Sequence, residues 1–223
     1  MSGFGAIVAT ALVAGSAVAA LDAVPSPPAR VATPVHIAFA ERAPVHLVVA
    51  PKNNSARYFV REQLASVNFP SDAVGVTDSV AGGIAVDDKG QIMPDSKFVV
   101  DITQLKSDRS MRDGYIQHRT LQTEQYPTVT LVPKAFQDLP SPLPDSGRVT
   151  FTLLGDLTVH GVTRPTNWSV IAYLRHGEVR GTASTGFTFD DFQLQKPRVF
   201  SVLSVADSIH LVYDFDLVPA PGS

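Results

Sequence analysis

Apolar and polar residues alternate with a period of two along most of the chain beyond residue 44. Because successive side chains of a strand point to opposite faces, this alternation is typical of β-strands that bury one face. The alternating runs are short, and the links between them are rich in Gly, Pro and Asp, which favour turns. These runs, nine in all, predict roughly eight strands, within residues 45–50, 57–61, 82–86, 97–102, 128–132, 149–153, 168–174, 179–187 and 209–217.

One segment and several positions depart from this simple alternation. Residues 110–121 lack it, and their apolar spacing predicts one or two helical turns. No long helix is expected, which argues against folds that alternate strands with helices. Ile171 and Tyr173 alternate with Trp168 and Leu174, so this strand is apolar on both faces. An all-β sandwich, a barrel with helices packed outside it, and a barrel around an apolar cavity all fit such strands.

Residues 155–165 connect two of the predicted strands. Their sequence, Gly-Asp-Leu-Thr-Val-His-Gly-Val-Thr-Arg-Pro, predicts a strand that ends, turns on Gly161 and restarts after Pro165. His160 lies in this turn, and we expect its imidazole to hold backbone carbonyls beside Gly161 and Thr163. The alternative role for His160 is a hydrogen bond to a ligand.

The first 43 residues differ in composition from the rest. Residues 3–21 carry no charge, are rich in Ala and Val, and include a small-residue site of the kind that signal peptidase cleaves, before Ala20. No Lys or Arg precedes them, and a stretch of about 19 residues is also long enough to anchor a chain in a bilayer. Residues 1–21 are therefore expected to be a signal peptide or a membrane anchor, and the Pro- and Ala-rich residues 22–43 a linker. Both alternatives place the domain at residues 44–219 outside the cytoplasm, either periplasmic, secreted or membrane-anchored.

Composition excludes several classes of function. The 223 residues carry a net charge of −3, which gives no basic field for nucleic acid. The chain has no cysteine, so it has no disulfide, thiol nucleophile or thiolate metal ligand. Its six histidines show no spacing typical of a metal site, and neither a nucleophile elbow nor a phosphate-binding glycine loop occurs. We therefore expect a protein without cofactor or metal that is not an enzyme.

Several short motifs occur in a fixed order through the domain. Besides residues 155–165, they are Val99-Asp101-Ile102 with Leu105-Lys106-Ser107-Asp108, Arg112-Asp113, Leu121 with Tyr126-Pro127-Thr128-Val129, and residues 203–209. In order and spacing these motifs resemble those of YceI-like, polyisoprenoid-binding domains, over about residues 39–219. Two positions differ from the family pattern: Tyr115 stands where the family often has His, and Asn54-Ser55 stand in place of an early His-Ser pair.

The resemblance implies an extended, antiparallel, eight-stranded lipocalin-like β-barrel with one or two short helices, which encloses a long apolar tunnel. The side chains that we expect to line this tunnel are Phe151, Leu153, Trp168, Val170 and Tyr213. The candidates for contact with a ligand head group are His160, Arg112, Tyr115 and Arg164. Arg112 could bind a phosphate through its planar guanidinium, although we prefer an arrangement in which Asp113 caps the helix start and pairs with Arg112.

The expected function is that of an exported protein that sequesters or carries an isoprenoid- or quinone-like amphiphile in an apolar barrel. The alternative is a non-catalytic interaction or adhesion module, built as a β-sandwich with a filled core. A third hypothesis, an enzyme acting on a bound isoprenoid, needs His160, Arg112 and Asp113 to point into the tunnel. Any association with a membrane is expected through residues 3–21.

Overall fold

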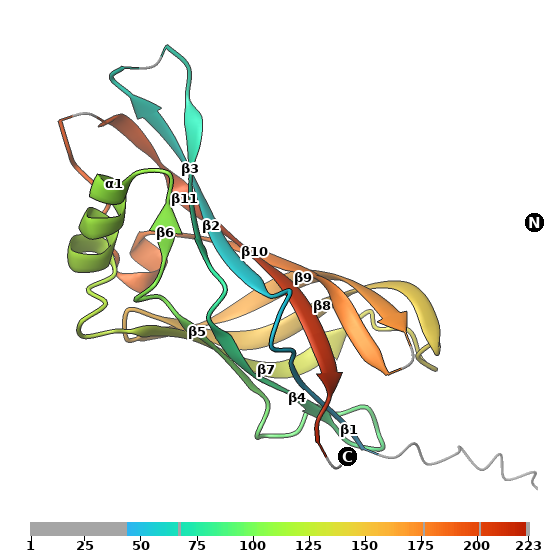
Figure 1. Cartoon of the computed structure of the whole chain (residues 1–223). Helices are drawn as coiled ribbons and strands as arrows, with labels where there is room; N and C mark the ends of the chain where they lie inside the picture. Colours follow the sequence, from blue (N-terminus) through green and yellow to red (C-terminus); the bar gives the residue numbers. More distant parts are fainter. Residues whose placement is uncertain (1–43, 67, 176, 201, 222–223) are drawn as a thin grey trace, which may run out of the picture. The chain divides into compact units, whose positions relative to one another are not determined.

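Antiparallel strand segments form one continuous sheet in the computed structural model, which describes residues 44–66, 68–175, 177–200 and 202–221 (Figure 1). The strand segments are β1 (Val45–Val49), β2 (Ser55–Leu64), β3 (Ser71–Thr77), β4 (Val80–Val86), β5 (Lys97–Asp101), β6 (Lys106–Ser107), β7 (Thr128–Gln137), β8 (Ser146–Val159), β9 (Val162–Arg175), β10 (Glu178–Thr188) and β11 (Val202–Pro219). The helical segments are α1 (Ser110–Tyr115), a π-helical turn η1 (Ile116–Thr120) and a 3-10 turn η2 (Asp190–Phe192).

The sheet closes on itself because the last strand pairs with the first. Val49 lies opposite Leu217, and Leu47 lies opposite Pro219. The closed ring consists of β1, β4, β5, β7, β8, β9, β10 and β11, so the structure is an eight-stranded antiparallel barrel. Closure gives hydrogen-bond partners to backbone groups that an open sheet edge would leave unpaired. The expected barrel is confirmed, and the two-sheet sandwich is not the architecture.

Three of the eight strands extend beyond the ring after a break in each. Residues 50–54 separate β1 from β2, residues 78–79 separate β3 from β4, and residues 102–105 separate β5 from β6. Beyond the breaks, β2 pairs with β11, β3 pairs with β2, and β6 pairs with β3. Each broken strand can be counted as one long strand: β1 with β2, β3 with β4, and β5 with β6. Together with the other five strands, these three make an eight-stranded up-and-down meander.

Connections of a meander lie alternately at its two ends. We call one end the helix end, because the β6–β7 connection there contains α1 and η1 and the β10–β11 connection contains η2. The β2–β3 hairpin and the β8–β9 turn belong to the same end. We call the other end the terminal end, because β1 begins and β11 ends there; Figure 1 shows α1 beside the start of β11, far from the C-terminus.

The side chain of Asn54 fills the break between β1 and β2. Its amide nitrogen donates hydrogen bonds to the carbonyl oxygens of Ala50 (2.8 Å) and Lys52 (3.0 Å). Its Oδ1 accepts hydrogen bonds from the Tyr213 hydroxyl (2.9 Å) and from the backbone N–H of Asp216 (3.1 Å). Buried backbone groups need hydrogen-bond partners, and at this break no strand neighbour supplies them. The side-chain amide of Asn54 supplies them instead.

At the break between β5 and β6, a side chain of the helical connection bonds to the backbone carbonyl oxygens in a similar way. The Nε2 of Gln117 donates hydrogen bonds to the carbonyl oxygens of Thr103 (3.3 Å) and Leu105 (3.0 Å). The Oδ1 of Asp101 accepts hydrogen bonds from the backbone N–H (2.8 Å) and hydroxyl (2.7 Å) of Thr103. These contacts hold η1 against the barrel wall.

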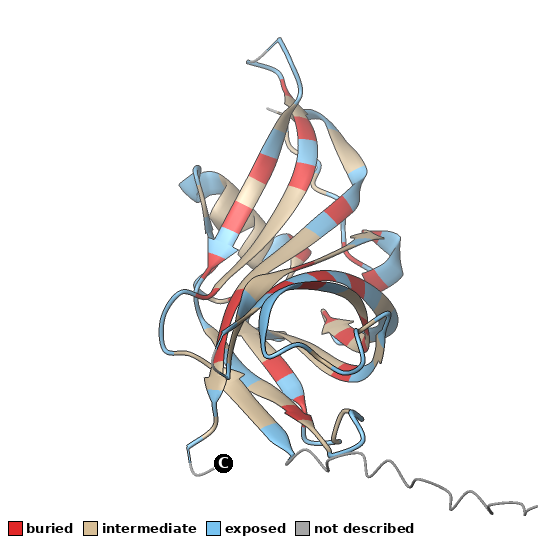
Figure 2. Ribbon diagram, turned by 90° about the vertical axis from the view of Figure 1, so that its right-hand side faces the viewer, coloured by how far each residue is buried: buried red, intermediate tan, exposed pale blue. Residues whose placement is uncertain are grey.

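One face of each strand turns inward and forms the core. On β8 the inward residues are odd-numbered, as Leu153 and Leu157 show, whereas on β9 they are even-numbered, as Trp168 and Val170 show. Figure 2 shows the resulting alternation of buried and exposed residues along the strands. This alternation is the period-two pattern of the sequence.

The structure corrects the expected course of residues 155–165. The strand does not restart after Pro165; β9 begins at Val162, and Pro165 lies inside it, opposite Asp156. Proline lacks an N–H donor, but β9 pairs with β10 only from Ser169 onward, so Pro165 lies where one side of β9 has no strand neighbour. Proline is tolerated at such a position.

Other predictions have mixed outcomes. The helical turns predicted for residues 110–121 are confirmed as α1 and η1. Strand β3 was not predicted, and neither was the two-residue β6, whose length is too short for a pattern. The signal or anchor at 1–21 and the linker at 22–43 lie outside the described residues. Within the described part of the chain, no helix has the length and apolar character needed to cross a bilayer.

We predict that Asn54→Ala destabilises the barrel, because it leaves two carbonyl oxygens and the Asp216 N–H without their partner. Leaving such groups unpaired lowers the free energy of unfolding by about 2–3 kcal/mol. The measurement is urea unfolding followed by circular dichroism. Asn167→Ala, at an exposed position of β9, is the control and should change stability by less than about 0.5 kcal/mol. Equal stability of both variants would contradict the bridging role.

Candidate functional site: the barrel interior and its helix end

The interior of the barrel is apolar and is not completely filled. Leu131 has paired neighbours on both sides, Phe98 and Leu157, and Leu211 is likewise flanked by Tyr58 and Thr185. Leu131 and Leu211 pack against the core and yet keep part of their surface accessible. Because strands cover both flanks of these side chains, the accessible surface faces the interior. The interior therefore has room beside its own side chains.

All five residues expected to line the tunnel lie on this inward face. Leu153, Trp168 and Val170 are buried in the core, whereas Phe151 and Tyr213 pack against it and remain partly exposed. Cross-strand pairing brings Leu153 opposite Trp168 and Phe151 opposite Val170. The structure thus places the five together, and their role in binding stays a prediction.

Two further aromatic residues of the interior, on β5 and β7, were not selected from the sequence. Phe98 on β5 is buried, and its ring lies 6.2 Å from that of Tyr213 in an edge-on arrangement. Phe136 on β7 meets Phe151 with ring centroids 5.5 Å apart. Alternation assigned each residue to a face of its own strand, but only the cross-strand register shows which faces meet.

The four candidate head-group residues all belong to the helix end. His160 lies in the β8–β9 turn, Arg112 and Tyr115 lie on α1, and Arg164 lies near the start of β9. Their common location follows from the meander, which puts these connections at one end. Their side chains, however, have different partners.

Arg112 is buried and already paired with carboxylates. Its guanidinium forms ion pairs with Glu62 of β2 and with Asp108, and the side chains of Arg112 and Glu62 are only 13% and 8% exposed. Burial alone would lower the pKa of Arg112, but Glu62 and Asp108 raise it above its ordinary value. Arg112 therefore attaches α1 to the sheet as a cation whose Nη1 and Nη2 are already paired with Asp108 and Glu62.

The expected pairing of Asp113 with Arg112 is not what the structure has. The Oδ1 of Asp113 instead accepts hydrogen bonds from the backbone N–H (2.8 Å) and hydroxyl (2.6 Å) of Ser107. No side chain caps the start of α1. Asp113 thus ties the helix to β6, because the cation that we assigned to it lies closer to Glu62.

Tyr115 and Arg164 are both tied to the β10–β11 connection. The Tyr115 hydroxyl accepts a hydrogen bond from the backbone N–H of Arg198 (3.5 Å). The Nε of Arg164 donates to the carbonyl oxygen of Asp191 (3.0 Å), while its side chain is otherwise exposed. Both contacts hold the connection in place across the helix end.

His160 occupies the tight turn as the sequence suggests, but its imidazole has other contacts than expected. His160 and Gly161 both have positive φ angles, +51° and +75°, as in the two-residue hairpins that match strand twist. The imidazole ring lies 4.5 Å from the ring of Tyr126, and its buried Nε2 has no hydrogen-bond partner among the described residues. The expected bonds to carbonyl oxygens are absent there, so Nε2 is, with the Oγ1 of Thr120, one of two unpartnered buried polar atoms among the described residues of this end.

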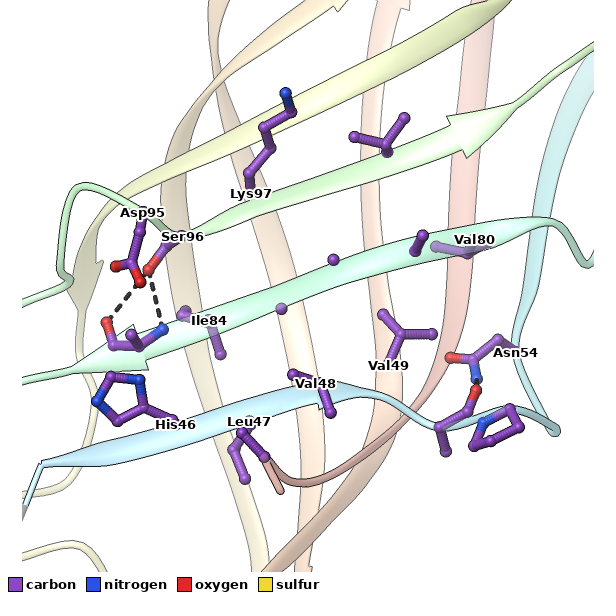
Figure 3. A pocket seen from close by; sticks show the side chains of 18 of the residues that line it. His46, Leu47, Val48, Val49, Asn54, Val80, Ile84, Asp95, Ser96 and Lys97 are labelled. Atoms are coloured by element: carbon purple, nitrogen blue, oxygen red, sulfur yellow. Dashed lines mark hydrogen bonds between the residues drawn. The ribbon is translucent and has the colours of Figure 1, made fainter. Parts of the chain in front are cut away.

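A pocket of about 850 Å³ lies on the outside of the barrel wall (Figure 3). His46, Val48 and Lys97 line it, and cross-strand pairing puts Val48 and Lys97 on one face with Gly83. The core residue Phe98 belongs to the opposite face, so this pocket is separate from the interior. The Ser96 hydroxyl at its rim is already bonded, since it donates to the Ala85 carbonyl oxygen (3.2 Å) and accepts from the Ala85 N–H (2.9 Å).

The described residues contain no cluster of three or more His, Asp or Glu side chains arranged to hold a metal ion. Tyr58 is the inward titratable group nearest to the Arg112 cluster. Burial raises its pKa to about 12; Arg112 opposes this shift, and Asp113, Glu62 and Asp108 add to it. Burial, with Asp216 adding to it, also raises the pKa of Tyr213. Both tyrosines therefore stay neutral hydrogen-bonding groups at ordinary pH.

The profile of the YceI-like domain family matches residues 48–217. This chain belongs to the YceI-like domain family. Its barrel is similar to a polyisoprenoid binding domain from Saccharophagus degradans, with a TM-score of 0.63 and 12% identity over 79% of this chain and 99% of that chain. It is also similar to BcnA from Burkholderia cenocepacia, with a TM-score of 0.55 and 14% identity over 73% and 95% of the two chains. At these identities the likeness establishes the fold alone, and no curated protein matches the sequence.

In this YceI-like domain, Arg112→Met is expected to destabilise the helix end, because it leaves the buried Glu62 carboxylate without its cation. Breaking a buried ion pair in this way lowers the free energy of unfolding by about 3–5 kcal/mol. The double variant Arg112→Met/Glu62→Met removes the orphaned charge and should recover most of this loss. Chemical unfolding of both variants tests the pair, and a double variant no better than the single one would argue against it.

The raised pKa values of the two partly buried tyrosines predict loss of stability in alkali. For Tyr58 the folded-state pKa of about 12 lies above the unfolded value of about 10, so its contribution is complete below pH 10 and is lost as pH rises toward 12. Tyr58→Phe should flatten the fall of unfolding free energy across this window, which urea titrations at several pH values measure. Tyr173→Phe, at an exposed position of β9, is the matched control. Identical profiles for Tyr58→Phe and the parent protein would refute the assignment.

Proposed function

We propose that this protein binds a long apolar chain, of the polyisoprenoid or quinone class, inside its barrel and carries it outside the cytoplasm. The observation that carries the proposal is the inward face itself. Leu131, Leu211 and Tyr213 lie between paired strands and still have accessible surface. A closed wall with apolar side chains and residual space suits an apolar ligand, because water gains few hydrogen bonds there.

The family supports the same class of ligand. The protein from Saccharophagus degradans with a similar fold is a polyisoprenoid binding domain. An isoprenoid is a long linear run of apolar, methyl-branched units, and a barrel extended by β2, β3 and β6 offers a correspondingly long wall. Each buried methylene contributes about 0.8 kcal/mol, so affinity would come from the length of chain enclosed.

Few polar groups remain for a head group at the helix end. Arg112 is occupied by Glu62 and Asp108, and Arg164 is bonded to a backbone carbonyl. The unpartnered Nε2 of His160 is the exception among our candidates. We therefore infer that a neutral, weakly polar head group suits this site better than a phosphate.

Catalysis has little support from the same groups. An enzyme acting on the bound chain would need titratable side chains that are free to exchange protons with it. Arg112 and Asp113 are held by ion pairs or hydrogen bonds, and Tyr58 stays neutral. We propose binding and transport without a covalent step. Export rests on residues 3–21, and N-terminal sequencing of protein recovered from outside the cytoplasm would test it.

Organic extraction of protein purified from its native host, followed by mass spectrometry, is the direct test of the ligand. We expect an isoprenoid or quinone in repeated preparations. If the parent protein carries stoichiometric lipid, Leu211→Trp loses it and Val212→Trp keeps it, the lipid is bound in the interior. Repeated extracts without lipid, together with failure to bind added isoprenoids, would reject the proposal.

We also predict how affinity depends on chain length. For a series of isoprenoid or alkyl alcohols, affinity should rise about fourfold per methylene until the interior is filled and then level off. Leu211→Trp puts bulk into the interior and should lower affinity about tenfold or more and shift the plateau to shorter chains. Val212→Trp, one residue along on the outer face of β11, should match the parent. Fluorescence competition measures all three proteins, and equal losses in both variants would place the ligand elsewhere.

A further inference from the structure

The helix end carries large apolar side chains that no other described residue covers. Phe200 is fully exposed, Met111 is 88% exposed, Phe69 is 78% exposed and Leu203 is 68% exposed. They come from three different connections: the β2–β3 hairpin, the β6–β7 connection and the β10–β11 connection with the start of β11. Scattered exposed apolar residues need no explanation, but a group of them at one end of a barrel does.

Strand register shows that these side chains gather at one tip. Glu62 pairs with Ser71 across the β2–β3 hairpin, and Leu64 pairs with Val202 of β11. Phe69, just before Ser71, and Phe200, just before Val202, therefore flank the same end of β2. Figure 1 shows this hairpin and the start of β11 projecting together beyond the ring.

Helix α1 adds Met111 to the same region. Met111 and Tyr115 are four residues apart and so share one face of the helix. The Tyr115 hydroxyl bonds to the backbone of Arg198, two residues from Phe200. We call the set Met111, Phe69, Phe200 and Leu203 the apolar tip.

We infer that the apolar tip inserts into the surface of a lipid bilayer. Aromatic and long aliphatic side chains at loop ends are suited to the boundary between head groups and acyl chains. Four side chains offer less area than the roughly 800 Å² per partner that a stable protein interface buries. A bilayer needs no shape-matched partner, so a small projecting tip suffices.

The distribution of charge supports this orientation. The helix-end connections carry five acidic and five basic residues and are neutral as a whole. At the terminal end the connections carry Asp87, Asp88, Asp95, Asp138 and Asp145 against Lys89. Anionic lipid would repel the acidic terminal end, whereas the neutral end can approach it.

The proposed orientation brings the helix end, with His160 and α1, to the membrane that would supply or receive an apolar ligand. It does not depend on the identity of that ligand, because the tip lies outside the barrel wall. Binding to vesicles can be measured with lipid-free protein. A protein that does not bind vesicles could therefore still bind a ligand in its interior. Likewise, a protein without an interior ligand could still bind vesicles.

The test is co-sedimentation of the full chain, and in parallel of a chain truncated to residues 44–223, with vesicles of phosphatidylcholine and phosphatidylglycerol. We expect partition of the parent and at least a tenfold loss for Phe69→Ser/Phe200→Ser, with unchanged thermal unfolding, because both side chains are exposed. The matched control is Ile171→Ser/Tyr173→Ser, two exposed apolar residues on the outer face of β9, which should partition like the parent. In the full chain, Phe69→Ser/Phe200→Ser should lower partition by the same factor, and any contribution from residues 1–43 should add to the partition of parent and variant alike.

Three results would overturn the inference. These are no partition of the parent, equal partition of parent and tip variant, and a larger loss in the β9 control than in the tip variant. The alternative is that the apolar tip is a contact between copies of this chain, and analytical ultracentrifugation of the same proteins measures such self-association. Self-association that disappears in Phe69→Ser/Phe200→Ser, without partition of the parent into vesicles, would identify the tip as a contact between copies of this chain.

Discussion

The barrel depends on satisfying the backbone polar groups where three of its strands break. A break in a closed wall exposes donors and acceptors that have neither a strand neighbour nor water, and each such group is costly to leave unpaired. Asn54 meets this need between β1 and β2, and Gln117 meets it between β5 and β6. Because these side chains replace ladder hydrogen bonds, β1 can close the ring with β11 while β2 extends it. The length of the interior thus rests on a few buried amides.

The same breaks connect the wall to the helix end. Gln117 belongs to η1, so the group that satisfies the β5–β6 break also fixes the helical connection. On the other side, Arg112 of α1 is paired with Glu62 of β2. Helix α1 is therefore held from both flanks by polar contacts and has no buried residue of its own. The apolar burial at this end comes instead from the β10–β11 connection, where Phe189, Phe192 and Leu194 belong to the core.

Much of the wall could be predicted from alternation alone, and the reason is physical. In a strand with one face in a core, apolar and polar residues alternate with a period of two. This alternation was enough to place Leu153 and Trp168 on the inward faces of their strands. Alternation says nothing of which strands are neighbours, and for that reason Phe98 and Phe136, whose rings meet those of Tyr213 and Phe151, were not selected. The family resemblance supplied the eight-stranded closure that spacing left open between sandwich and barrel. Strand β6 has two residues and carries no pattern, so no sequence argument could find it.

The polar contacts of the helix end were predicted less well, because they depend on distances between segments remote in sequence. Arg112 was paired with its neighbour Asp113, yet it bonds to Glu62, fifty residues away. Its role changes accordingly, from a ligand contact to the attachment of a helix. Because Glu62 and Asp108 neutralise its cation, Arg112 does not select an anionic head group. What remains there is the unpartnered Nε2 of His160, an apolar interior behind it and an apolar tip in front. Such an arrangement favours ligands chosen by the length of their apolar chain over ligands chosen by charge.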